Sequence, residues 1–479
     1  MAIFRANLIL VLVLVLQVNL FVPFLQEPLE RDEGAYAYIA QRLRVGEVPY
    51  RDSFDHKPPA IYFTYAFIFK YFGESILSIR LFTLLVSLLC TLLIYLIAYW
   101  FWGSMGALLA AFLYALFSGG PFIQGTSANT ETFMLLPMLI AFYLFILSIK
   151  KNLWDNLALL CAGIFSGLAV MFKPVALLNY LALFLFAFFL PDRSGKEKTL
   201  NLINLGLGFL LFPLVFLYYF WTKQALFDFI NLAFVYNFTY LHSQLWFWSN
   251  YLRVFICANS ILWLLAISAA IHIMLKERKY ELWLLTIWAA LSVLGVISGK
   301  SFYGHYFIQA MPALILLSTF TLLKYREERS VNISSITMAV ALFALSIIII
   351  IYQYQIYLSP PDKISLIKYG YPNFVVAREV AEYAKAHTAP KDSLYVWGAE
   401  PEIYFYSQRK AASKNIYYYP LFNAKELTLK PIVEELARHQ PKEIILAAPM
   451  IEKSVLADYI KLKYQKIKTF WQWEVWERK

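Results

Sequence analysis

Residues 4–25 read FRANLILVLVLVLQVNLFVPFL, and a polar stretch that contains Glu30-Arg31-Asp32-Glu33 follows directly. The first run is apolar over about twenty residues, the length at which a helix crosses the roughly 30 Å hydrocarbon core of a bilayer. Comparable runs recur near 77–101, 104–120, 131–149, 154–171, 174–190, 200–221, 253–275, 281–298, 304–323 and 333–357. The sequence therefore predicts an α-helical polytopic membrane protein with about eleven transmembrane helices.

The composition supports this fold class. Of the 479 residues, 60% are hydrophobic and only 15% are charged, whereas soluble domains carry about 25% charged residues. The formal net charge of +11 is typical of basic turns on the cytoplasmic side of a membrane protein, and we do not expect nucleic-acid binding. The three cysteines lie in apolar runs without metal or redox spacing. The first run lacks a small-residue cleavage site, so we expect it to be retained as a span.

The distribution of basic residues predicts the orientation. With the N-terminus in the cytoplasm, the inner turns hold Arg193, Lys276 and Lys324 among other basic residues, whereas the outer turns hold Lys173 and Lys300. This distribution agrees with the general enrichment of Lys and Arg in short cytoplasmic loops. We therefore expect a protein of the cell (inner) membrane whose first polar loop lies on the outer face. The basic residues of that loop argue the other way, and a spanning segment at 58–71 would place the loop in the cytoplasm.

Two helices are expected within the first loop. Residues 32–43 place Ala35, Tyr36 and Ile39 on one face at helical spacing, which indicates an amphipathic helix in the membrane interface. Pro58-Pro59 suits the first turn of a second helix, which runs to about residue 71. At 1.5 Å per residue this helix is roughly 21 Å long, too short to cross the bilayer comfortably. We expect it to lie in the interface as well.

After about residue 358 the pattern changes from long apolar runs to short alternating ones. Segments 393–397 and 443–447 are predicted as strands, and segments 374–387 and 431–439 as amphipathic helices. The chain thus divides into a transmembrane domain, 1–358, and a small C-terminal α/β domain, 359–479. By the number of spans, the second domain lies on the outer face.

Asp32 and Glu33 are the first candidates for chemistry. Adjacent carboxylates at the start of a helix are often there because the helix dipole stabilises them. The alternative is a general base that takes the proton of an attacking hydroxyl. Because successive helix residues point about 100° apart, only one of the two can face the reacting atom. We predict Asp32 as the base and Glu33 as the group that orients the acceptor or a metal.

The cluster Asp55-His56-Lys57 is either a solvated loop or part of the same site. Lys57 is predicted to neutralise a phosphate leaving group, because cations stabilise developing phosphate charge. Asp55 and His56 are candidate ligands of a divalent metal ion, although two such residues are a weak metal signal.

Further ionisable residues fall at the outer ends of predicted spans, namely Arg80, Glu131, Lys173 and His305. Each alone is well explained as a side chain that extends to the interface. Together they lie on the same predicted face as the acidic pair, where the anionic headgroup of a lipid would sit. We therefore predict all four, and Tyr36 of the first loop, as contacts of a lipid phosphate or its sugar.

Several short motifs resemble a known family: Arg31-Asp32-Glu33-Gly34-Ala35-Tyr36, His56-Lys57-Pro58-Pro59, Arg80-Leu81, Met171-Phe172-Lys173-Pro174, Gly304-His305-Tyr306 and Met311-Pro312-Ala313-Leu314. In this order they resemble the bacterial membrane glycosyltransferases of the GT-C class. The nearest branch joins the protein O-mannosyltransferases to the aminoarabinose lipid A (ArnT-like) transferases. The resemblance covers essentially the whole chain, including an outer α/β domain.

The resemblance implies an inverting sugar transfer from a polyprenyl-phosphate donor to a lipid, glycan or protein acceptor on the outer face. It implies Asp32 as the base, Lys57 and Arg80 at the lipid phosphate, and Glu33 at the acceptor. His56 stands where the aminoarabinose branch carries a Glu, which argues against carrying over a metal site. The first loop has no Asp-x-Asp motif of the oligosaccharyltransferase type.

Two other functions stay open at this point. A transporter or flippase of lipid-linked sugars would place ionisable residues in mid-span or break helices in paired repeats. The predicted span centres are nearly free of charge, which favours the transferase. A scaffold or polymerase subunit whose outer domain binds a partner is the third hypothesis.

Overall fold

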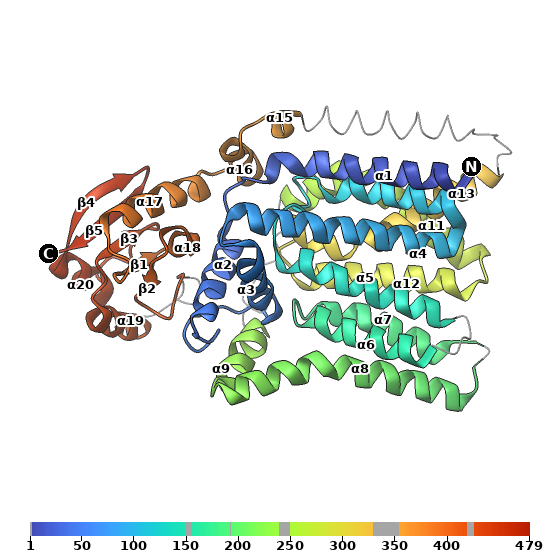
Figure 1. Cartoon of the computed structure of the whole chain (residues 1–479), viewed down its shortest axis with the longest axis horizontal. Helices are drawn as coiled ribbons and strands as arrows, with labels where there is room; N and C mark the ends of the chain where they lie inside the picture. The colour runs from blue at the N-terminus through green and yellow to red at the C-terminus, as the bar shows by residue number, and fades with distance from the viewer. Residues whose placement is uncertain (1, 150–154, 192, 239–249, 329–353, 419–425) are drawn as a thin grey trace. The chain divides into compact units, whose positions relative to one another are not determined.

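The computed structural model describes residues 2–149, 155–191, 193–238, 250–328, 354–418 and 426–479 (Figure 1). Packing divides the chain into two compact units. The helical unit comprises 1–25, 80–219 and 238–359, and the mixed unit comprises 26–79, 220–237 and 360–479. The predicted domains, 1–358 and 359–479, stay a prediction. The units differ from them because the first loop clusters with the C-terminal segment.

The helical unit consists of long helices that run side by side and of a few short helical segments (Figure 1). They are α1 (Ala2–Phe21), η1 (Val22–Phe24), α4 (Ile76–Ser118), α5 (Thr130–Ile149), α6 (Asp155–Val170), α7 (Ala176–Phe189), α8 (Gly195–Thr222), α11 (Asn250–Lys276), α12 (Tyr280–Ser298), η3 (Gly304–Gln309), α13 (Met311–Glu328) and α15 (Tyr354–Tyr357). Each predicted span up to residue 323 coincides with helical structure. Most of the last predicted span, 333–353, lies outside the described residues.

Six helices in the described part of the chain are long and apolar enough to cross a membrane. One of them, α4, has 43 residues and departs from helical geometry at Gly103, whose φ is 67°. A residue with a side chain rarely adopts this φ, so glycine permits the break that separates the predicted spans 77–101 and 104–120. Helices α6, α7 and α13 are shorter apolar helices. The prediction of a polytopic helical membrane protein is confirmed.

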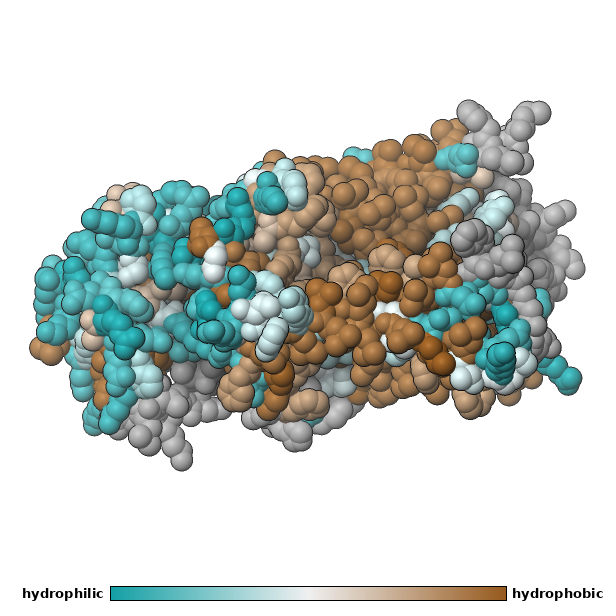
Figure 2. Space-filling view, turned by 60° about the horizontal axis from the view of Figure 1, so that its bottom comes forward, coloured by the Kyte–Doolittle hydropathy of each residue, from teal (hydrophilic) through white to brown (hydrophobic). Residues whose placement is uncertain are grey.

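Apolar side chains on the outside of the helices account for the hydropathy of this unit. At least half of the surface of four apolar residues of α1 is exposed, namely Leu8, Val11, Leu12 and Val15. Figure 2 shows hydrophobic residues over a broad part of the surface of the helical unit. A surface of this kind is stable in lipid and not in water.

Close helix packing in this unit depends on small residues. Gly163 and Gly167 of α6 lie against the backbone of α8. A Cβ at Gly163 would come 2.2 Å from the Leu205 carbonyl oxygen, and a Cβ at Gly167 would come 2.2 Å from that of Phe209. Glycines four residues apart allow two membrane helices to approach in this way.

The mixed unit contains the two helices that were predicted in the first loop. They are α2 (Arg31–Arg44) and α3 (Ala60–Phe72). The unit also contains α9 (Leu226–Ile230), the π-helix Asn231–Val235, α16 (Pro361–Tyr369), α17 (Asn373–His387), β1 (Ser393–Trp397), α18 (Glu402–Ser407), β2 (Lys410–Ala411), α19 (Glu426–His439), β3 (Glu443–Leu446), α20 (Val455–Lys463), β4 (Tyr464–Phe470) and β5 (Trp473–Arg478). The predicted strands and helices are confirmed, although α19 begins five residues before Pro431, which lies inside the helix.

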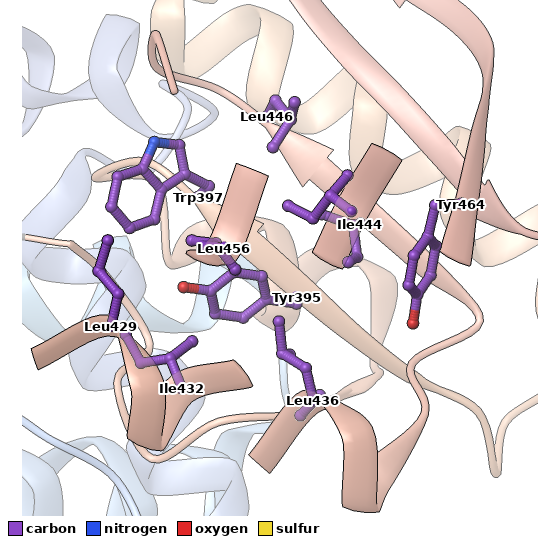
Figure 3. Packing of buried hydrophobic residues seen from close by; sticks show 11 residues of the cluster. Tyr395, Trp397, Leu429, Ile432, Leu436, Ile444, Leu446, Leu456 and Tyr464 are labelled. Atoms are coloured by element: carbon purple, nitrogen blue, oxygen red, sulfur yellow. The ribbon is translucent and has the colours of Figure 1, made fainter. Parts of the chain in front are cut away.

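The strands form one mixed sheet in the order β2-β1-β3-β5-β4. Strand β1 is parallel to β2 and β3, and β5 is antiparallel to β3 and β4. Alternate residues of β1 and β3, which include Tyr395, Trp397 and Ile444, point to one face of the sheet. There they pack with apolar residues of α19 and α20, as Figure 3 shows.

The first loop packs directly on the sheet domain. A Cβ at Gly34 of α2 would come 2.4 Å from Cβ of Glu402 in α18, so only glycine allows this approach. The Tyr38 hydroxyl accepts the Ala411 backbone N–H over 2.8 Å. Together these contacts fix α2, which carries the acidic pair, to the C-terminal segment.

Candidate functional site

The N-terminus of α2 is held by a capping box. The Glu30 carboxylate accepts the backbone N–H groups of Asp32 at 3.2 Å and Glu33 at 3.3 Å, and Glu33 Oε2 accepts the Glu30 N–H at 3.0 Å. These contacts satisfy donors that a helix start otherwise leaves unpaired. Glu33 is fully buried. Its predicted role toward the acceptor stays a prediction, and the structure gives it a capping role.

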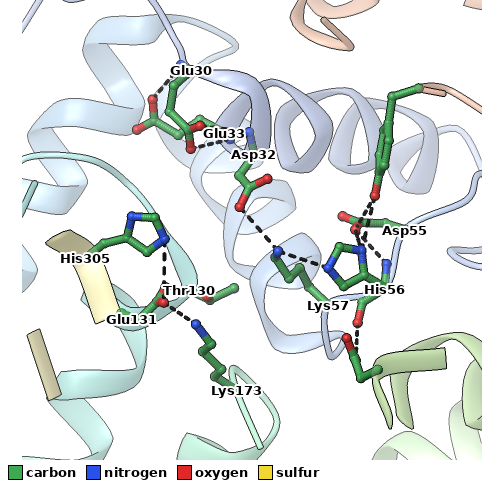
Figure 4. A network of polar contacts seen from close by, with 12 residues as sticks. Glu30, Asp32, Glu33, Asp55, His56, Lys57, Thr130, Glu131, Lys173 and His305 are labelled. Atoms are coloured by element: carbon green, nitrogen blue, oxygen red, sulfur yellow. Dashed lines mark hydrogen bonds and ion pairs between the residues drawn. The ribbon is translucent and has the colours of Figure 1, made fainter. Parts of the chain in front are cut away.

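Three carboxyl groups crowd this helix start. Burial raises the pKa of Glu30 to about 8, and the neighbouring charges of Asp32 and Glu33 add to the effect. Asp32 and Glu33 point in different directions, as expected for adjacent helix residues (Figure 4).

Asp32 forms an ion pair with Lys57. Asp32 Oδ2 lies 3.3 Å from Lys57 Nζ, and the two side chains are 33% and 19% exposed. On its other side, Lys57 Nζ lies 3.2 Å from Nε2 of His56. The structure therefore brings together the predicted base and the predicted phosphate cation, which are 25 positions apart in the sequence.

Asp55, two residues before Lys57, is buried. Its Oδ1 accepts the backbone N–H of His56 at 2.6 Å and the hydroxyl of Tyr417 at 2.8 Å. Burial raises the pKa of Asp55, the Lys57 charge opposes this shift, and the Asp32 charge adds to it. Tyr417 comes from the C-terminal segment of the mixed unit.

Side chains from several segments hold the backbone of this loop. The Tyr50 hydroxyl donates to the Lys57 carbonyl oxygen over 2.7 Å, and the Tyr62 hydroxyl donates to the same oxygen over 3.2 Å. Asn237, directly after the π-helix and Tyr236, donates to the His56 carbonyl oxygen over 2.7 Å. Extended π-type turns are frequent at functional sites.

Tyr36 is placed differently from the other predicted contacts. Its side chain is 1% exposed, and its ring centroid lies 6.1 Å from that of Tyr62 and 5.8 Å from that of Tyr65. The ring thus packs inside an aromatic group between α2 and α3. Its predicted role at the substrate stays a prediction.

A second polar cluster forms within the helical unit around Glu131. This residue is in the first turn of α5, is 2% exposed and is hydrogen-bonded to Lys173. The Thr130 hydroxyl donates to Glu131 Oε2 over 2.7 Å, and His305 Nε2 lies 3.9 Å from Oε1. Lys173 Nζ also lies 3.8 Å from the centre of the Tyr306 ring. Three residues predicted from the sequence therefore meet here.

Short connections at the helix ends bring this cluster together. A Cβ at Gly304 would come 1.8 Å from the Phe122 carbonyl oxygen, so glycine lets η3 approach the segment before α5. His305 Nδ1 lies 2.8 Å from Gln124 Oε1 of that segment. Arg80 is fully buried, and its Nη1 lies 3.5 Å from the carbonyl oxygen of Thr126.

Comparisons with known proteins agree with this architecture. A family model described as dolichyl-phosphate-mannose-protein mannosyltransferase matches residues 56–221, and one described as competence-induced protein Ccs4 C-terminal domain matches residues 377–479. A search of curated proteins gave no match. ArnT from Cupriavidus metallidurans bound to undecaprenyl phosphate superposes with a TM-score of 0.66 at 13% identity, over 99% of this chain and 98% of that chain.

Two further structures extend the comparison. The apo state of ArnT from Cupriavidus metallidurans has a TM-score of 0.65 at 16% identity, over 99% of this chain and 98% of that chain. The oligosaccharyltransferase AglB from Archaeoglobus fulgidus, in complex with an inhibitory peptide and a dolichol-phosphate, has a TM-score of 0.57 at 13% identity. That match covers 92% of this chain and 69% of that chain.

The chain has the GT-C fold. The predicted resemblance to the mannosyltransferase and ArnT-like group is confirmed. The family model that matches residues 56–221 is named for a mannosyltransferase, and one of the matched structures is named as an oligosaccharyltransferase.

In this GT-C chain, Asp55 and His56 are both engaged by protein groups, and their role as metal ligands stays a prediction. A lysine ammonium only donates, so Lys57 engages the lone pair of His56 Nε2, while the other ring nitrogen faces Asp55 at 3.5 Å. Among the described residues, no group of three His, Cys, Asp or Glu side chains could hold a metal ion. Structural metal sites in proteins use more ligands than this pair supplies.

The sequence alone did not single out Tyr417 or Asn237. Neither lies in a spaced motif, and each is far along the chain from the loop that it contacts. The capping box had a readable signal, because Glu30 and Glu33 have the spacing of an N-cap residue and its partner.

Proposed function

We propose that this chain moves a sugar from a polyprenyl-phosphate donor to an acceptor on the outer face of the cell (inner) membrane. The observation that carries the proposal is the partly exposed Asp32–Lys57 ion pair at 3.3 Å in a chain with the GT-C fold. This reaction requires a carboxylate to take the proton of the attacking hydroxyl and a cation to stabilise the leaving phosphate.

The proposed reaction is a single inverting displacement. Asp32 takes the proton of an acceptor hydroxyl, and the hydroxyl oxygen forms a bond to the anomeric carbon of the sugar. The bond from that carbon to the phosphate oxygen breaks, and the polyprenyl phosphate leaves with the electron pair. Lys57 stabilises the charge that develops on the leaving phosphate.

The remaining predicted residues are assigned by the same proposal. Arg80, Lys173 and His305 are proposed contacts of the lipid phosphate or its sugar, with Glu131 holding Lys173 and His305 in place. The bias of basic residues toward the turns assigned to the cytoplasm supports an outer-face location for the C-terminal segment.

Turnover by the purified full-length protein in lipid nanodiscs tests the proposal. A panel of undecaprenyl-phosphate-linked hexoses and aminoarabinose is supplied with total cell-envelope lipid as acceptor, and released undecaprenyl phosphate is measured by mass spectrometry. We expect release with at least one donor, an inverted anomeric configuration in the product, and a loss of release in Lys57→Gln. Movement of the donor across proteoliposome membranes without release would instead identify a flippase.

A further inference from the structure

A chain of polar contacts runs from the C-terminal segment of the mixed unit to the Asp32–Lys57 pair. The Tyr417 hydroxyl donates to Asp55 Oδ1 over 2.8 Å, and the same oxygen accepts the His56 backbone N–H at 2.6 Å. His56 Nε2 lies 3.2 Å from Lys57 Nζ, which lies 3.3 Å from Asp32 Oδ2 (Figure 4). All five residues belong to the mixed unit.

The hydrogen-bond donors and acceptors next to His56 determine its tautomer. Because the Lys57 ammonium has donors only, Nε2 of His56 must accept, and a neutral ring then carries its proton on Nδ1. His56 Nδ1 lies 3.5 Å from both Asp55 Oδ1 and the Tyr417 oxygen. A carboxylate behind an imidazole fixes the orientation and the tautomer of the ring.

The exposed fraction of the side chains increases along these polar contacts, from Asp55 to Asp32. The side chain of Asp55 is 3% exposed, that of His56 17%, and those of Lys57 and Asp32 19% and 33%. Tyr417, at the buried end, is 6% exposed as a whole residue. Its ring packs edge-on against Phe54, with the ring centres 5.6 Å apart. The hydrogen bonds of Tyr417 therefore reach the exposed end through the residues between them.

We propose that Tyr417 is a positioning residue of the transferase. It fixes the Asp55 carboxylate, which holds His56 in the tautomer that accepts from Lys57, and so it sets the position of the Lys57 ammonium. The inference rests on the proposed function, since Lys57 is taken to meet the donor phosphate. The C-terminal segment would then contribute a group to phosphate binding in addition to supporting α2.

Lipid binding by the full-length protein in nanodiscs is the first test. The probe is undecaprenyl phosphate, and undecaprenol, which lacks the phosphate, is the reference ligand. Tyr417→Phe removes the hydroxyl and keeps the ring, and we expect about tenfold weaker binding of undecaprenyl phosphate with unchanged binding of undecaprenol. Asp55→Asn should give a similar loss, and the double variant should lose little more than either single one.

Tyr418→Phe is the matched control. Tyr418 is the next residue, and its ring packs against Trp397, 5.7 Å between centres, away from the contact chain. We expect the affinity for undecaprenyl phosphate to stay at the wild-type value. An equal loss for undecaprenol and undecaprenyl phosphate in Tyr417→Phe would indicate a general packing defect and would overturn the proposal.

Solid-state NMR of isotope-labelled histidine provides a second measurement. The His56 signals are assigned by their loss in His56→Gln. We expect the Nδ1–H tautomer in the wild type and a mixture of tautomers in Tyr417→Phe. An unchanged tautomer together with unchanged affinity in Tyr417→Phe would overturn the proposal. If the wild type fails to bind undecaprenyl phosphate while Tyr417→Phe still changes the tautomer, the transferase assignment fails and the contact chain stands.

Discussion

Two lysine–carboxylate pairs join residues that were predicted from the sequence as site residues, and their surroundings differ. In the mixed unit, Asp32 is one third exposed and lies 3.3 Å from Lys57. In the helical unit, Glu131 is 2% exposed and bonds to Lys173. The Thr130 hydroxyl donates a hydrogen bond to Glu131 Oε2, and His305 Nε2 lies 3.9 Å from Glu131 Oε1.

This difference separates a group that can react from a group that holds a structure. A general base must reach a substrate proton, and a partly exposed carboxylate at the end of a polar chain meets that condition. A buried carboxylate that is surrounded by protein donors is less accessible to a substrate hydroxyl. We therefore expect the Asp32 carboxylate to act in the chemical step, and the Glu131 carboxylate to support stability and to hold Lys173 and His305 in place.

The largest expected effect is on turnover when the Asp32 carboxylate is neutralised. Asp32→Asn keeps the size of the side chain and removes the base, so we expect a loss of sugar release of about 10²- to 10⁴-fold with an unchanged melting temperature. Asp52→Asn is the control, because Asp52 is in the same loop and pairs with the exposed Arg51. Wild-type turnover in Asp32→Asn would remove Asp32 as the base.

Loss of the Glu131 carboxylate is expected to act first on stability. Glu131→Gln leaves the Lys173 ammonium without its charged partner in a buried cluster, so we expect a loss of about 3 kcal/mol of stability and a lower melting temperature in detergent. Glu74→Gln breaks the exposed Arg44–Glu74 pair and should change the melting temperature little. A Glu131→Gln protein with the wild-type melting temperature would contradict the structural role of this carboxylate.

The sequence predicted the parts of the molecule that depend on local pattern. Apolar runs located the spans, and even the break in α4 at Gly103 fell between two predicted spans. The helices at Asp32 and after Pro59 followed from the spacing of apolar residues and from proline in a first turn. These features are set by residues within one or two helical turns of each other.

The contacts of the candidate site were predictable only in part. Charge and position indicated Asp32 and Lys57, because ionisable residues are rare in so apolar a chain. Tyr417 reaches Asp55 across 362 positions of sequence, and no spacing rule relates them. The burial of Glu33 also depends on how α2 packs against α18, a tertiary contact that a single sequence does not reveal.

The packing of α2 against α18 is expected to position Asp32, and a substitution at Gly34 tests this. Gly34→Ala puts a Cβ 2.4 Å from Cβ of Glu402, so we expect a loss of about 2 kcal/mol of stability and reduced turnover as Asp32 shifts. Gly206→Ala in α8 is the control, since no atom lies within 4 Å of its added Cβ. Replacing a helical glycine in open space should be neutral or slightly stabilising. Equal melting temperatures for the two variants would contradict the packing of α2.

The smallest expected effect concerns Glu443, a buried carboxyl that lacks the cation partner of Glu131. Burial raises its pKa to about 7, the charge of Glu477 adds to this, and Lys442 opposes it. Because the pKa in the folded state is above the ordinary glutamate value of 4.5, the folded protein binds more protons than the unfolded chain between these pH values. Stability from this group is therefore fully present below pH 4.5 and is lost as the pH rises through about 7.

Glu443→Gln removes this titration. We expect the variant to be more stable than the wild type by about 1 kcal/mol at pH 8.5, and the advantage to shrink as the pH is lowered toward 5. Thermal unfolding of both proteins across this range measures the difference. The same series on Glu131→Gln should keep its destabilisation at pH 8.5, because that carboxylate is held by cations. A Glu443→Gln protein that is less stable than the wild type at pH 8.5 would mean that the fold favours the charged form of Glu443.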